Sequence, residues 1–283
     1  MTSRIRLLAI DIDGTLLSPT FDVSERDLSA LVMARERGVE IVLATGRRHS
    51  FAMEIAAILG FELWMITSNG AVTKSTGGEL FHCELLPRAH ARHVIAHMND
   101  YRNRAVITFD KDQKGALVLE SDAGMADSIG RWLDRNSQLV DFVVPLENSL
   151  SEDPIQLMFC GTIAQMAEAE RHLMILNAGY PKITILKTVY PMRDLCLLDV
   201  LNSDCSKGKT LARWARHRGV DPSEVMAIGD NYNDIEMLEY AGCPVIMGNA
   251  TAELRGRGWA ETLGNHQDGV AAAVEKYILN RNN

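Results

Sequence analysis

The sequence predicts an α/β protein built on a doubly wound parallel sheet, with a second domain of mixed α+β character. Three observations lead to this prediction. Strand-like apolar runs alternate with helical stretches towards both ends of the 283-residue chain, the middle of the chain loses that alternation, and polar clusters directly follow several of the apolar runs. A chain of this length also exceeds one typical domain, so a second domain is expected.

The first third of the chain shows the strand and helix alternation most clearly. An apolar run at residues 5–12 ends in acidic residues and predicts a buried strand that delivers side chains to a loop. Ser24 is placed to N-cap an amphipathic helix, and Gly38 ends that helix before the next apolar run. Repeated units of this kind specify a parallel sheet with right-handed crossovers. The next elements expected are a strand at 39–44, a helix around 50–59 and a strand at 63–67.

The pattern changes between roughly Phe81 and Tyr190, where short strand-like stretches neighbour helical ones. That mixture predicts an α+β insert. The alternation then returns with a strand at 195–201, a helix at 207–218, a strand at 225–228, a helix at 233–241 and a strand at 244–247. We therefore expect a discontinuous core domain at 1–84 and 191–283, and an inserted domain at 85–190.

The charge balance and the cysteine usage narrow the classes of function. The chain has 29 lysine and arginine residues against 37 acidic ones, a formal charge of −8, and no basic cluster. Nucleic acid is not expected as a partner, because affinity for its phosphate backbone needs clustered cations. The five cysteines are odd in number and widely spaced, and neither a secretory apolar region nor eighteen consecutive apolar residues occurs. We expect reduced thiols, no membrane association, a cytoplasmic location and no obligate protein partner.

The first polar cluster, at residues 11–15, has the sequence Asp-Ile-Asp-Gly-Thr. Strand alternation would send the carboxylates of Asp11 and Asp13 the same way unless the chain bends after Asp11. Two carboxylates at the end of a buried strand are costly without a cation or a proton. They indicate a metal or catalytic site, and an ordinary acidic turn is the alternative.

Two further clusters could hold an oxyanion. At Ala44-Thr45-Gly46-Arg47, a hydroxyl and a glycine N–H follow an apolar strand and could face one anion, although a Thr-Gly turn into a helix is also a common structural device. Lys207 falls at a predicted helix start, where the positive end of the helix dipole disfavours a cation. An anion shared between this lysine and the helix would explain its position, and plain exposure to solvent is the alternative.

The fourth cluster, Gly229-Asp230-Asn231-Tyr232-Asn233-Asp234, follows the predicted strand at 225–228. It brings a second pair of carboxylates to a strand end, with amides beside them. Oxygen ligands of this kind suit Mg²⁺, which often also takes a substrate phosphate oxygen. Taken alone, the cluster could also be a polar turn that caps the next helix.

Together and in this order, the four clusters resemble the haloacid dehalogenase (HAD) superfamily of aspartyl phosphotransferases, specifically its Cof-type phosphatases of subfamily IIB. The resemblance spans nearly the whole chain and implies a Rossmannoid core with an inserted α+β cap of the C2 type. The matching segments are Asp11-Ile12-Asp13-Gly14-Thr15-Leu16, Leu43-Ala44-Thr45-Gly46-Arg47, Asn69-Gly70-Ala71, Ser206-Lys207-Gly208, Gly229-Asp230-Asn231-Tyr232-Asn233-Asp234 and Gly248-Asn249-Ala250.

The resemblance also implies a mechanism. Asp11 would attack phosphorus as the nucleophile, and Asp13 would act first as general acid and then as general base. Mg²⁺ would bind the side chains of Asp11 and Asp230 and the backbone carbonyl of Asp13, while Asp234 supports the site without binding the ion directly. The phosphoryl oxygens would be held by Thr45, Lys207, Asn233 and the backbone N–H groups near Ile12 and Gly46.

The function that the resemblance implies is Mg²⁺-dependent hydrolysis of a small phosphorylated metabolite, with sugar phosphates as the leading class. Asp13 favours a phosphatase or mutase, because the dehalogenase and phosphonatase branches lack a carboxylate there. The alternatives are a phosphomutase or phosphotransferase of the same superfamily and a non-catalytic protein that binds a phospho-metabolite. A non-catalytic protein is disfavoured by the intact set of candidate catalytic residues, which are Asp11, Asp13, Lys207 and Asp230. The side chains that select the substrate are expected in the cap, where no motif identifies them.

Two other patterns point to different chemistry and fit less well. Gly208-Lys209-Thr210 could belong to a P-loop, but Ser203 stands where that loop needs its opening glycine. His93 and His97 have the spacing of a zinc pair, but the residues between them include no glutamate for hydrolytic zinc chemistry. We expect these histidines on a solvated or half-buried helix face.

Overall fold

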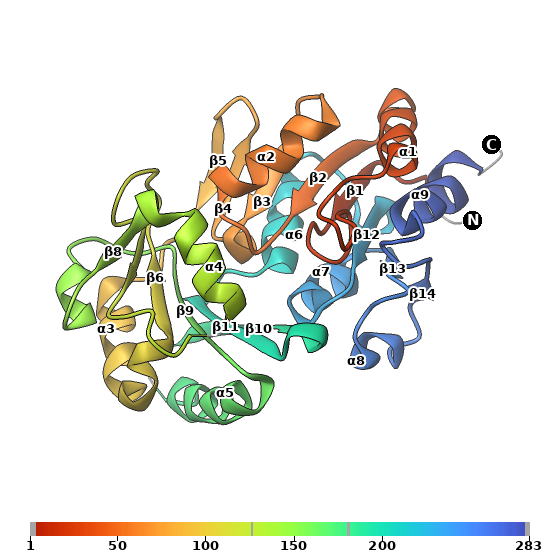
Figure 1. Ribbon diagram of the computed structural model, residues 1–283. Helices are drawn as coiled ribbons and strands as arrows, with labels where there is room; N and C mark the ends of the chain where they lie inside the picture. Colours follow the sequence, from red (N-terminus) through yellow and green to blue (C-terminus); the bar gives the residue numbers. More distant parts are fainter. Residues whose placement is uncertain (1–3, 126, 180–181, 281–283) are drawn as a thin grey trace. The chain divides into compact units, whose positions relative to one another are not determined.

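The computed structural model describes residues 4–125, 127–179 and 182–280 (Figure 1). The chain divides into two compact units. The core unit contains the chain up to Cys83 and from Ser206 onward, and the inserted unit runs from Glu84 to Cys205. Each unit has its own β-sheet. No helix in the described part of the chain is long and apolar enough to cross a bilayer.

The core unit is built on an eight-stranded sheet with the strand order β14-β13-β12-β1-β2-β3-β4-β5. The strands from β14 to β3 are parallel, and β4 and β5 add an antiparallel edge. The chain enters the sheet at β1, between β12 and β2, and extends it on both sides, which is the doubly wound arrangement that the sequence predicted. The strands are β1 (Leu7–Ile10), β2 (Glu40–Ala44), β3 (Trp64–Thr67), β4 (Val72–Ser75), β5 (Leu80–Cys83), β12 (Val225–Gly229), β13 (Cys243–Ile246) and β14 (Ala260–Glu261).

Helices bury both faces of the core sheet. Strand alternation places Leu8 on one face, where it joins a buried cluster with Leu31, and Leu7 on the other, in a cluster with Trp214. Because both faces are covered, the parallel strands are continuous apolar runs without polar alternation. The core helices are α1 (Glu25–Glu36), α2 (His49–Leu59), α6 (Lys207–His217), α7 (Ile235–Tyr240), α8 (Ala252–Arg255) and α9 (Gly269–Val274), with shorter helical turns at Ser68–Gly70, Pro222–Glu224, Tyr232–Asp234 and Glu275–Leu279.

Helix α1 begins after the predicted cap residue. The Ser24 side chain accepts a hydrogen bond from the N–H of Asp27 at 3.0 Å. The Asp27 carboxylate is buried and accepts a hydrogen bond from the N–H of Ala271 at 2.7 Å. Asp268, the residue before α9, makes no capping bond with its own side chain. Asp27 therefore serves the first turn of α9 and ties the two helices together.

The inserted unit contains a six-stranded sheet with the order β10-β11-β9-β6-β7-β8. Its pairs are antiparallel except for β7 and β8. Helix α5 begins with a capping box made by Thr162 and Gln165, and its Glu170 pairs with Lys187 of β10 at 2.8 Å. The elements are α3 (Arg88–His97), β6 (Ala105–Thr108), β7 (Leu117–Leu119), α4 (Asp127–Arg135), β8 (Val140–Phe142), β9 (Gln156–Gly161), α5 (Ile163–Asn177), β10 (Ile183–Tyr190) and β11 (Leu195–Asn202), with helical turns at Asn99–Arg104, Ser137–Leu139, Leu146–Ser149 and Pro191–Arg193.

The chain returns to the core unit later than the boundary expected at residue 191. Strand β11, which the sequence analysis placed in the parallel core, pairs antiparallel with β10 and β9 in the inserted sheet. A turn at Pro191–Arg193, followed by Asp194 with a φ of 42°, folds β11 back along β10. A short apolar run has the same pattern in either sheet, so periodicity alone could not assign β11.

Replacing Asp27 with alanine should lower the free energy of unfolding by about 1–3 kcal/mol, because it removes the acceptor of a buried N–H. Urea denaturation of the variant and the wild type would measure the difference. The control is Asp22→Ala, at an exposed aspartate, which should change stability by less than about 0.5 kcal/mol. Equal unfolding midpoints for the two variants would show that the Asp27 contact contributes nothing.

Candidate active site

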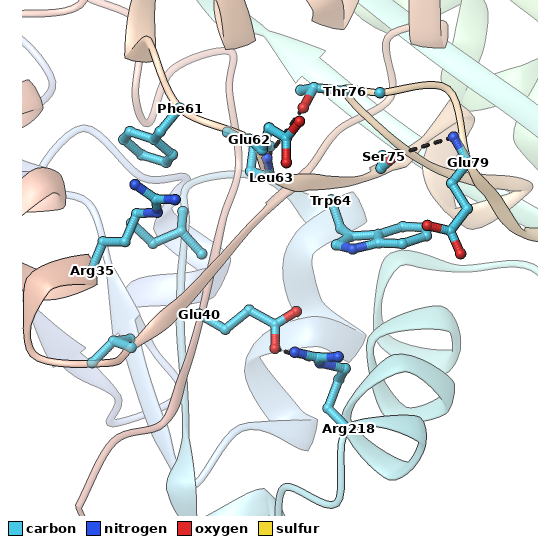
Figure 2. A pocket seen from close by; sticks show the side chains of 13 residues that line it. Arg35, Glu40, Phe61, Glu62, Leu63, Trp64, Ser75, Thr76, Glu79 and Arg218 are labelled. Atoms are coloured by element: carbon cyan, nitrogen blue, oxygen red, sulfur yellow. Dashed lines mark hydrogen bonds and ion pairs between the residues drawn. The ribbon is translucent and has the colours of Figure 1, made fainter.

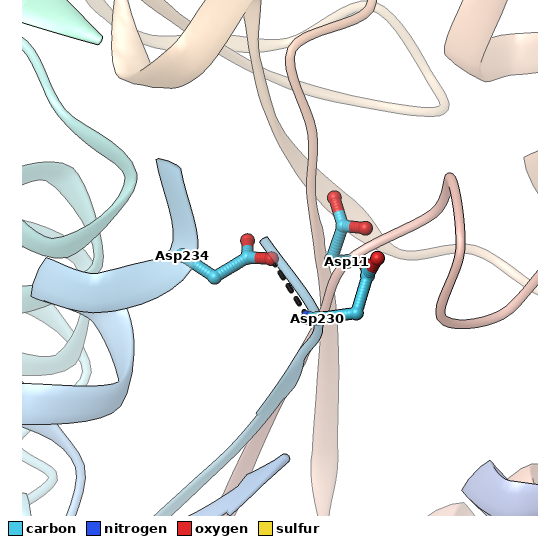
Figure 3. A group of neighbouring side chains, drawn as sticks. All are labelled: Asp11, Asp230 and Asp234. Carbon is cyan, nitrogen blue, oxygen red and sulfur yellow. Dashed lines mark hydrogen bonds between the residues drawn. The ribbon is translucent and has the colours of Figure 1, made fainter. Parts of the chain in front are cut away.

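The carboxyl ends of β1 and β12 bring three aspartates together. Asp11 follows β1 and Asp230 follows β12, and these strands are neighbours in the parallel sheet. Asp234 lies at the end of the helical turn that comes next. Each aspartate offers one carboxylate oxygen, these oxygens lie within 4.8 Å of one another, and all three side chains are buried (Figure 3). The two acidic clusters of the sequence therefore form one site.

Lys207 balances part of this negative charge. Its Nζ lies 2.6 Å from Oδ1 of Asp11 and 2.7 Å from Oδ1 of Asp234, and its side chain is fully buried. The alternative of a solvent-exposed lysine is therefore wrong. A buried ion pair of this kind needs all its partners, because removing one leaves an uncompensated charge.

Burial and crowding shift the pKa values of the charged groups in this cluster. Burial raises the pKa of Asp11 to about 7, although the nearby charge of Lys207 opposes the shift. Burial, together with repulsion from Asp11 and Asp234, raises the pKa of Asp230 well above its usual value. Burial alone would lower the pKa of Lys207, but the two carboxylates outweigh it and raise that pKa. The cluster thus carries more negative charge than its lysine balances.

The residues around Lys207 explain why it points into the site. Ser206 caps α6 by accepting a hydrogen bond from the N–H of Lys209 at 3.1 Å, so the helix begins at Lys207. The Ser206 hydroxyl also donates to the carboxylate of Glu236 on α7. Gly208 allows the close approach of the two helices, because a Cβ there would lie 2.4 Å from the Glu236 carbonyl oxygen. Packing of α6 on α7 therefore sets the position of the lysine.

Asp234 is held by the protein on both carboxylate oxygens. Oδ1 accepts from Lys207, and Oδ2 accepts from the backbone N–H groups of Asp230 and Asn231, each at 3.0 Å. Gly229 makes room for this carboxylate, because a Cβ there would lie 2.6 Å from Cβ of Asp234. With both oxygens engaged, Asp234 is suited to orienting the loop after β12 and Lys207.

Asp13 pairs with an arginine. The chain bends at Gly14, where φ is +88° and a Cβ would lie 2.4 Å from Oδ2 of Asp230. Arg47 binds Asp13 through two hydrogen bonds of 2.7 Å, donated by Nε and Nη2. The Asp13 and Arg47 side chains are 27% and 22% exposed. The two carboxylates of the first cluster therefore occupy different environments.

The predicted phosphate-binding residues lie at the same edge of the core sheet. Thr45 follows β2, and its hydroxyl accepts a hydrogen bond from the N–H of Arg47 at 3.1 Å. Asn233 donates through Nδ2 to Oδ1 of Asn69 at 3.0 Å, and Gly46 lies against the same Asn69 carboxamide. Four of the predicted residues follow the carboxyl ends of β1, β2 and β12, and the fifth begins α6. They are Ile12, Thr45, Gly46, Asn233 and Lys207.

Two contacts of this site were not predicted from the sequence. They are the pair of Arg47 with Asp13 and the hydrogen bond of Asn233 to Asn69. Arg47 and Asn69 both lie in segments that resemble HAD-superfamily motifs. Their place in those motifs was the only feature of the sequence that pointed to them. The order of residues within one segment does not show which side chains of another segment they contact.

A separate hollow of about 440 Å³ lies in the core unit at the other end of the strands (Figure 2). It is lined by Glu40 and Trp64, the first residues of β2 and β3, and by Arg218, which pairs with Glu40 at 2.8 Å. The 13 residues that line it include none of the predicted site residues. The candidate active site therefore lies at the carboxyl ends of the parallel strands, and this hollow lies at their amino ends.

The structure does not support the P-loop or the zinc alternative. Lys209, which a P-loop would need at a phosphate, is exposed, and His93 is exposed on α3. His97 contacts the backbone carbonyl of His172 through Nε2 at 3.2 Å. Over residues 4–125, 127–179 and 182–280, the acidic cluster around Asp11 is the only group with the spacing of metal ligands.

Comparison with known proteins identifies the family. A family model described as haloacid dehalogenase-like hydrolase matches residues 8–274. The chain belongs to this family. Phosphatase YwpJ of Bacillus subtilis is 29% identical to this HAD-like chain, over 97% of the chain and 100% of that protein. An HMP-PP phosphatase of Shigella flexneri is 31% identical, over 88% of the chain and 86% of that protein.

Solved structures show the same fold. A haloacid dehalogenase-like hydrolase from B. subtilis matches with a TM-score of 0.80 and 26% identity, over 96% of this chain and 99% of that one. The HAD subclass IIB sugar phosphatase BT4131 matches with a TM-score of 0.77 and 23% identity, over 96% and 98%. The family model and the phosphatases among its relatives confirm the prediction that this HAD-like chain is a phosphatase. The solved structures confirm the predicted α/β fold.

Replacing Lys207 with methionine should destabilise the protein by about 3–5 kcal/mol above neutral pH, because two buried carboxylates lose their cation. Lys207 lowers the pKa of Asp11, so without the lysine this pKa rises above the wild-type value of about 7, and the loss should shrink as the pH falls towards 7 and Asp11 of the variant takes up a proton. Urea denaturation at several pH values would measure both effects. Lys209→Met, at an exposed lysine of the same helix, is the control and should change stability by less than about 0.5 kcal/mol. A Lys207→Met loss that did not vary with pH would contradict this explanation.

Proposed function

We propose that this phosphatase removes the phosphoryl group from a small metabolite through a phosphoaspartate on Asp11, with Mg²⁺ as cofactor and sugar phosphates as the leading substrate class. The observation that carries the proposal is the buried contact of Asp11 with Lys207, beside Asp230 and at the carboxyl end of β1. A carboxylate whose ionised form is favoured by a neighbouring lysine, in a site with oxyanion donors, can act as a nucleophile towards phosphorus.

The residues present fit a Mg²⁺ ion. Three buried carboxylates share the site with one lysine, and the raised pKa values of Asp11 and Asp230 indicate that a cation would relieve excess negative charge. Carboxylate and carbonyl oxygens are the ligands that this ion prefers. We expect it on the side chains of Asp11 and Asp230 and the backbone carbonyl of Asp13, with Asp234 holding the loop. When bound, it would neutralise and orient the phosphoryl group.

Asp11 would form the new bond to phosphorus while the bond to the leaving oxygen breaks. Lys207 touches Oδ1 of Asp11, and its charge would also stabilise the negative phosphoryl oxygens in the transition state. Positioning and charge neutralisation supply most of the catalysis in phosphoryl transfer. The other proposed donors to those oxygens are the Thr45 hydroxyl, the Asn233 amide and the backbone N–H groups near Ile12 and Gly46.

Asp13 would transfer the protons. In its two-bond pair with Arg47 it is a carboxylate, the form that takes a proton from water when the phosphoaspartate is hydrolysed. To protonate the leaving oxygen in the first step, Asp13 must itself carry a proton. The pair with Arg47 must therefore loosen for that step and can re-form for the second.

The relatives support a small phosphorylated substrate. One is an HMP-PP phosphatase, and one structural neighbour is a sugar phosphatase. The proposed catalytic residues all belong to the core unit, so the inserted unit is free to vary with the leaving group. We propose that it acts as the cap that selects the substrate.

Phosphate release from a panel of phosphorylated metabolites, with and without Mg²⁺, tests the proposed function. The wild type should release phosphate only with Mg²⁺, and Asp11→Asn should lose activity by on the order of 10³-fold or more, because the amide is not a nucleophile. Asp22→Asn, at an exposed aspartate, is the matched control and should keep wild-type rates. An active Asp11→Asn would overturn the nucleophile assignment, and isomerisation faster than release would indicate a mutase.

Asp13→Asn should slow both the formation and the breakdown of the phosphoenzyme, each by roughly 10²–10⁴-fold, because both steps need its proton transfer. Rapid-quench single-turnover kinetics would separate the two steps. The fold should be unchanged, since Asp13 is partly exposed. A variant that slowed only one step would show that Asp13 does not act in both.

A further inference from the structure

The segment Ser68-Asn69-Gly70 has no part in the function proposed above, yet its backbone is unusual. The φ angles of its three residues are +48°, +53° and +101°. Ser68 and Asn69 are strained at these angles, because only glycine, and to a lesser degree asparagine, accepts a positive φ readily. Backbone strain of this kind persists where the surrounding structure fixes it, and it gathers at functional sites.

Contacts on both sides hold the segment in this shape. The N–H of Ser68 donates to the Arg47 carbonyl at 2.7 Å, and the N–H of Asn69 donates to the Thr45 carbonyl at 2.9 Å. On the other side, the Thr210 hydroxyl of α6 donates to the Gly70 carbonyl at 2.9 Å. The segment is therefore anchored between the Thr45–Arg47 turn and the helix that carries Lys207.

The strained backbone turns the Asn69 side chain towards two proposed phosphate-binding elements. The carboxamide is fully buried, and its Oδ1 accepts a hydrogen bond from Nδ2 of Asn233 at 3.0 Å. A Cβ on Gly46 would lie 3.2 Å from the same oxygen, so the Gly46 backbone rests directly on the Asn69 side chain. One side chain thus contacts both the turn after β2 and the loop after β12.

We infer that Asn69 is a positioning residue that sets the orientation of Asn233 for phosphoryl binding. The inference rests on the role of Asn233 in the proposed function. An amide nitrogen carries two N–H groups, and when one donates to Asn69 the plane of the Asn233 amide is fixed. The second N–H then has a defined direction and can donate to a phosphoryl oxygen. Asn233 is itself buried, so rotation away from Asn69 would leave a polar group without its partner.

The inference also explains why the strain is retained at this position. A side chain that must reach Asn233 from a left-handed backbone cannot be glycine, and asparagine is the residue type that tolerates such a φ most readily among those with an amide oxygen. Ser68 has a similarly strained backbone. The hydrogen bond to Asn233 comes from the Asn69 side chain, and the Ser68 hydroxyl takes no part in it. The two neighbours therefore form a matched pair for experiment.

The first test compares Asn69→Gly with Ser68→Gly, because glycine accepts the φ of either residue. Both variants should fold, and Ser68→Gly should keep kcat/KM for p-nitrophenyl phosphate within about twofold of the wild type. Asn69→Gly should lose roughly 10–100-fold in kcat/KM and should bind inorganic phosphate, measured as a competitive inhibitor, more weakly. Full activity of Asn69→Gly would overturn the inference. So would an equal loss in Ser68→Gly, since that would mean that the strained backbone matters and the carboxamide does not.

A double-mutant cycle with Asn233→Ala tests whether Asn69 acts through Asn233. If it does, adding Asn69→Gly to Asn233→Ala should change kcat/KM by less than about threefold, because the orienting contact is already lost. Losses that multiply, or an Asn233→Ala variant with wild-type activity, would overturn the inference. Should Asn69→Gly not fold, Asn69→Ser, whose hydroxyl is too short to reach Asn233, replaces it in the same cycle. An active Asp11→Asn variant would refute the proposed nucleophile. The cycle would still show whether Asn69 acts through Asn233, because it does not involve Asp11.

Discussion

The contact of the Lys207 ammonium with Asp11 and Asp234 is the interaction on which the rest of the site depends. It joins segments that are 196 residues apart in the chain, at the point where the two halves of the core unit meet. Buried carboxylates without a cation either take up protons or destabilise the fold. The lysine therefore favours the ionised form of the proposed nucleophile, and it also joins the two halves of the core-unit sequence.

Close backbone approach makes this concentration of charge feasible. Gly14 passes next to the Asp230 carboxylate, Gly229 passes next to Asp234, and Gly208 lets α6 pack on α7. A side chain at any of these positions would separate the strand ends that carry the acidic groups. These three glycines and the strained turn around Asn69 lie where the charged groups converge. Unusual backbone geometry in the core unit is therefore found at the candidate site.

Much of the fold and part of the site followed from the sequence, because parallel strands end at one edge of their sheet. Acidic residues directly after two apolar runs marked Asp11 and Asp230 as candidate site residues, the resemblance to the HAD superfamily implied that they share a metal ion, and a lysine at a helix start indicated an anion near Lys207. These signals are local. The contacts of Arg47 with Asp13 and of Asn69 with Asn233 depend on loop shape, which periodicity does not encode.

The placement of β11 was wrong for a related reason. Its apolar run is compatible with a parallel core strand and with an antiparallel hairpin, and only the pairing with β10 distinguishes the two. The same limit applies to the substrate, because the inserted unit carries no motif whose chemistry names a leaving group. Local patterns therefore identified the end of the sheet that carries the candidate active site, and the contacts between its loops became visible only in the structure.

The most direct test of the central claim is to trap the covalent intermediate on Asp11. During turnover of a substrate with Mg²⁺, the protein would be quenched with borohydride, which reduces an acyl phosphate to the alcohol, and then digested for mass spectrometry. The account predicts a reduced residue at position 11, dependent on both substrate and Mg²⁺. Reduction at another carboxylate, or steady turnover with no modified residue, would contradict it.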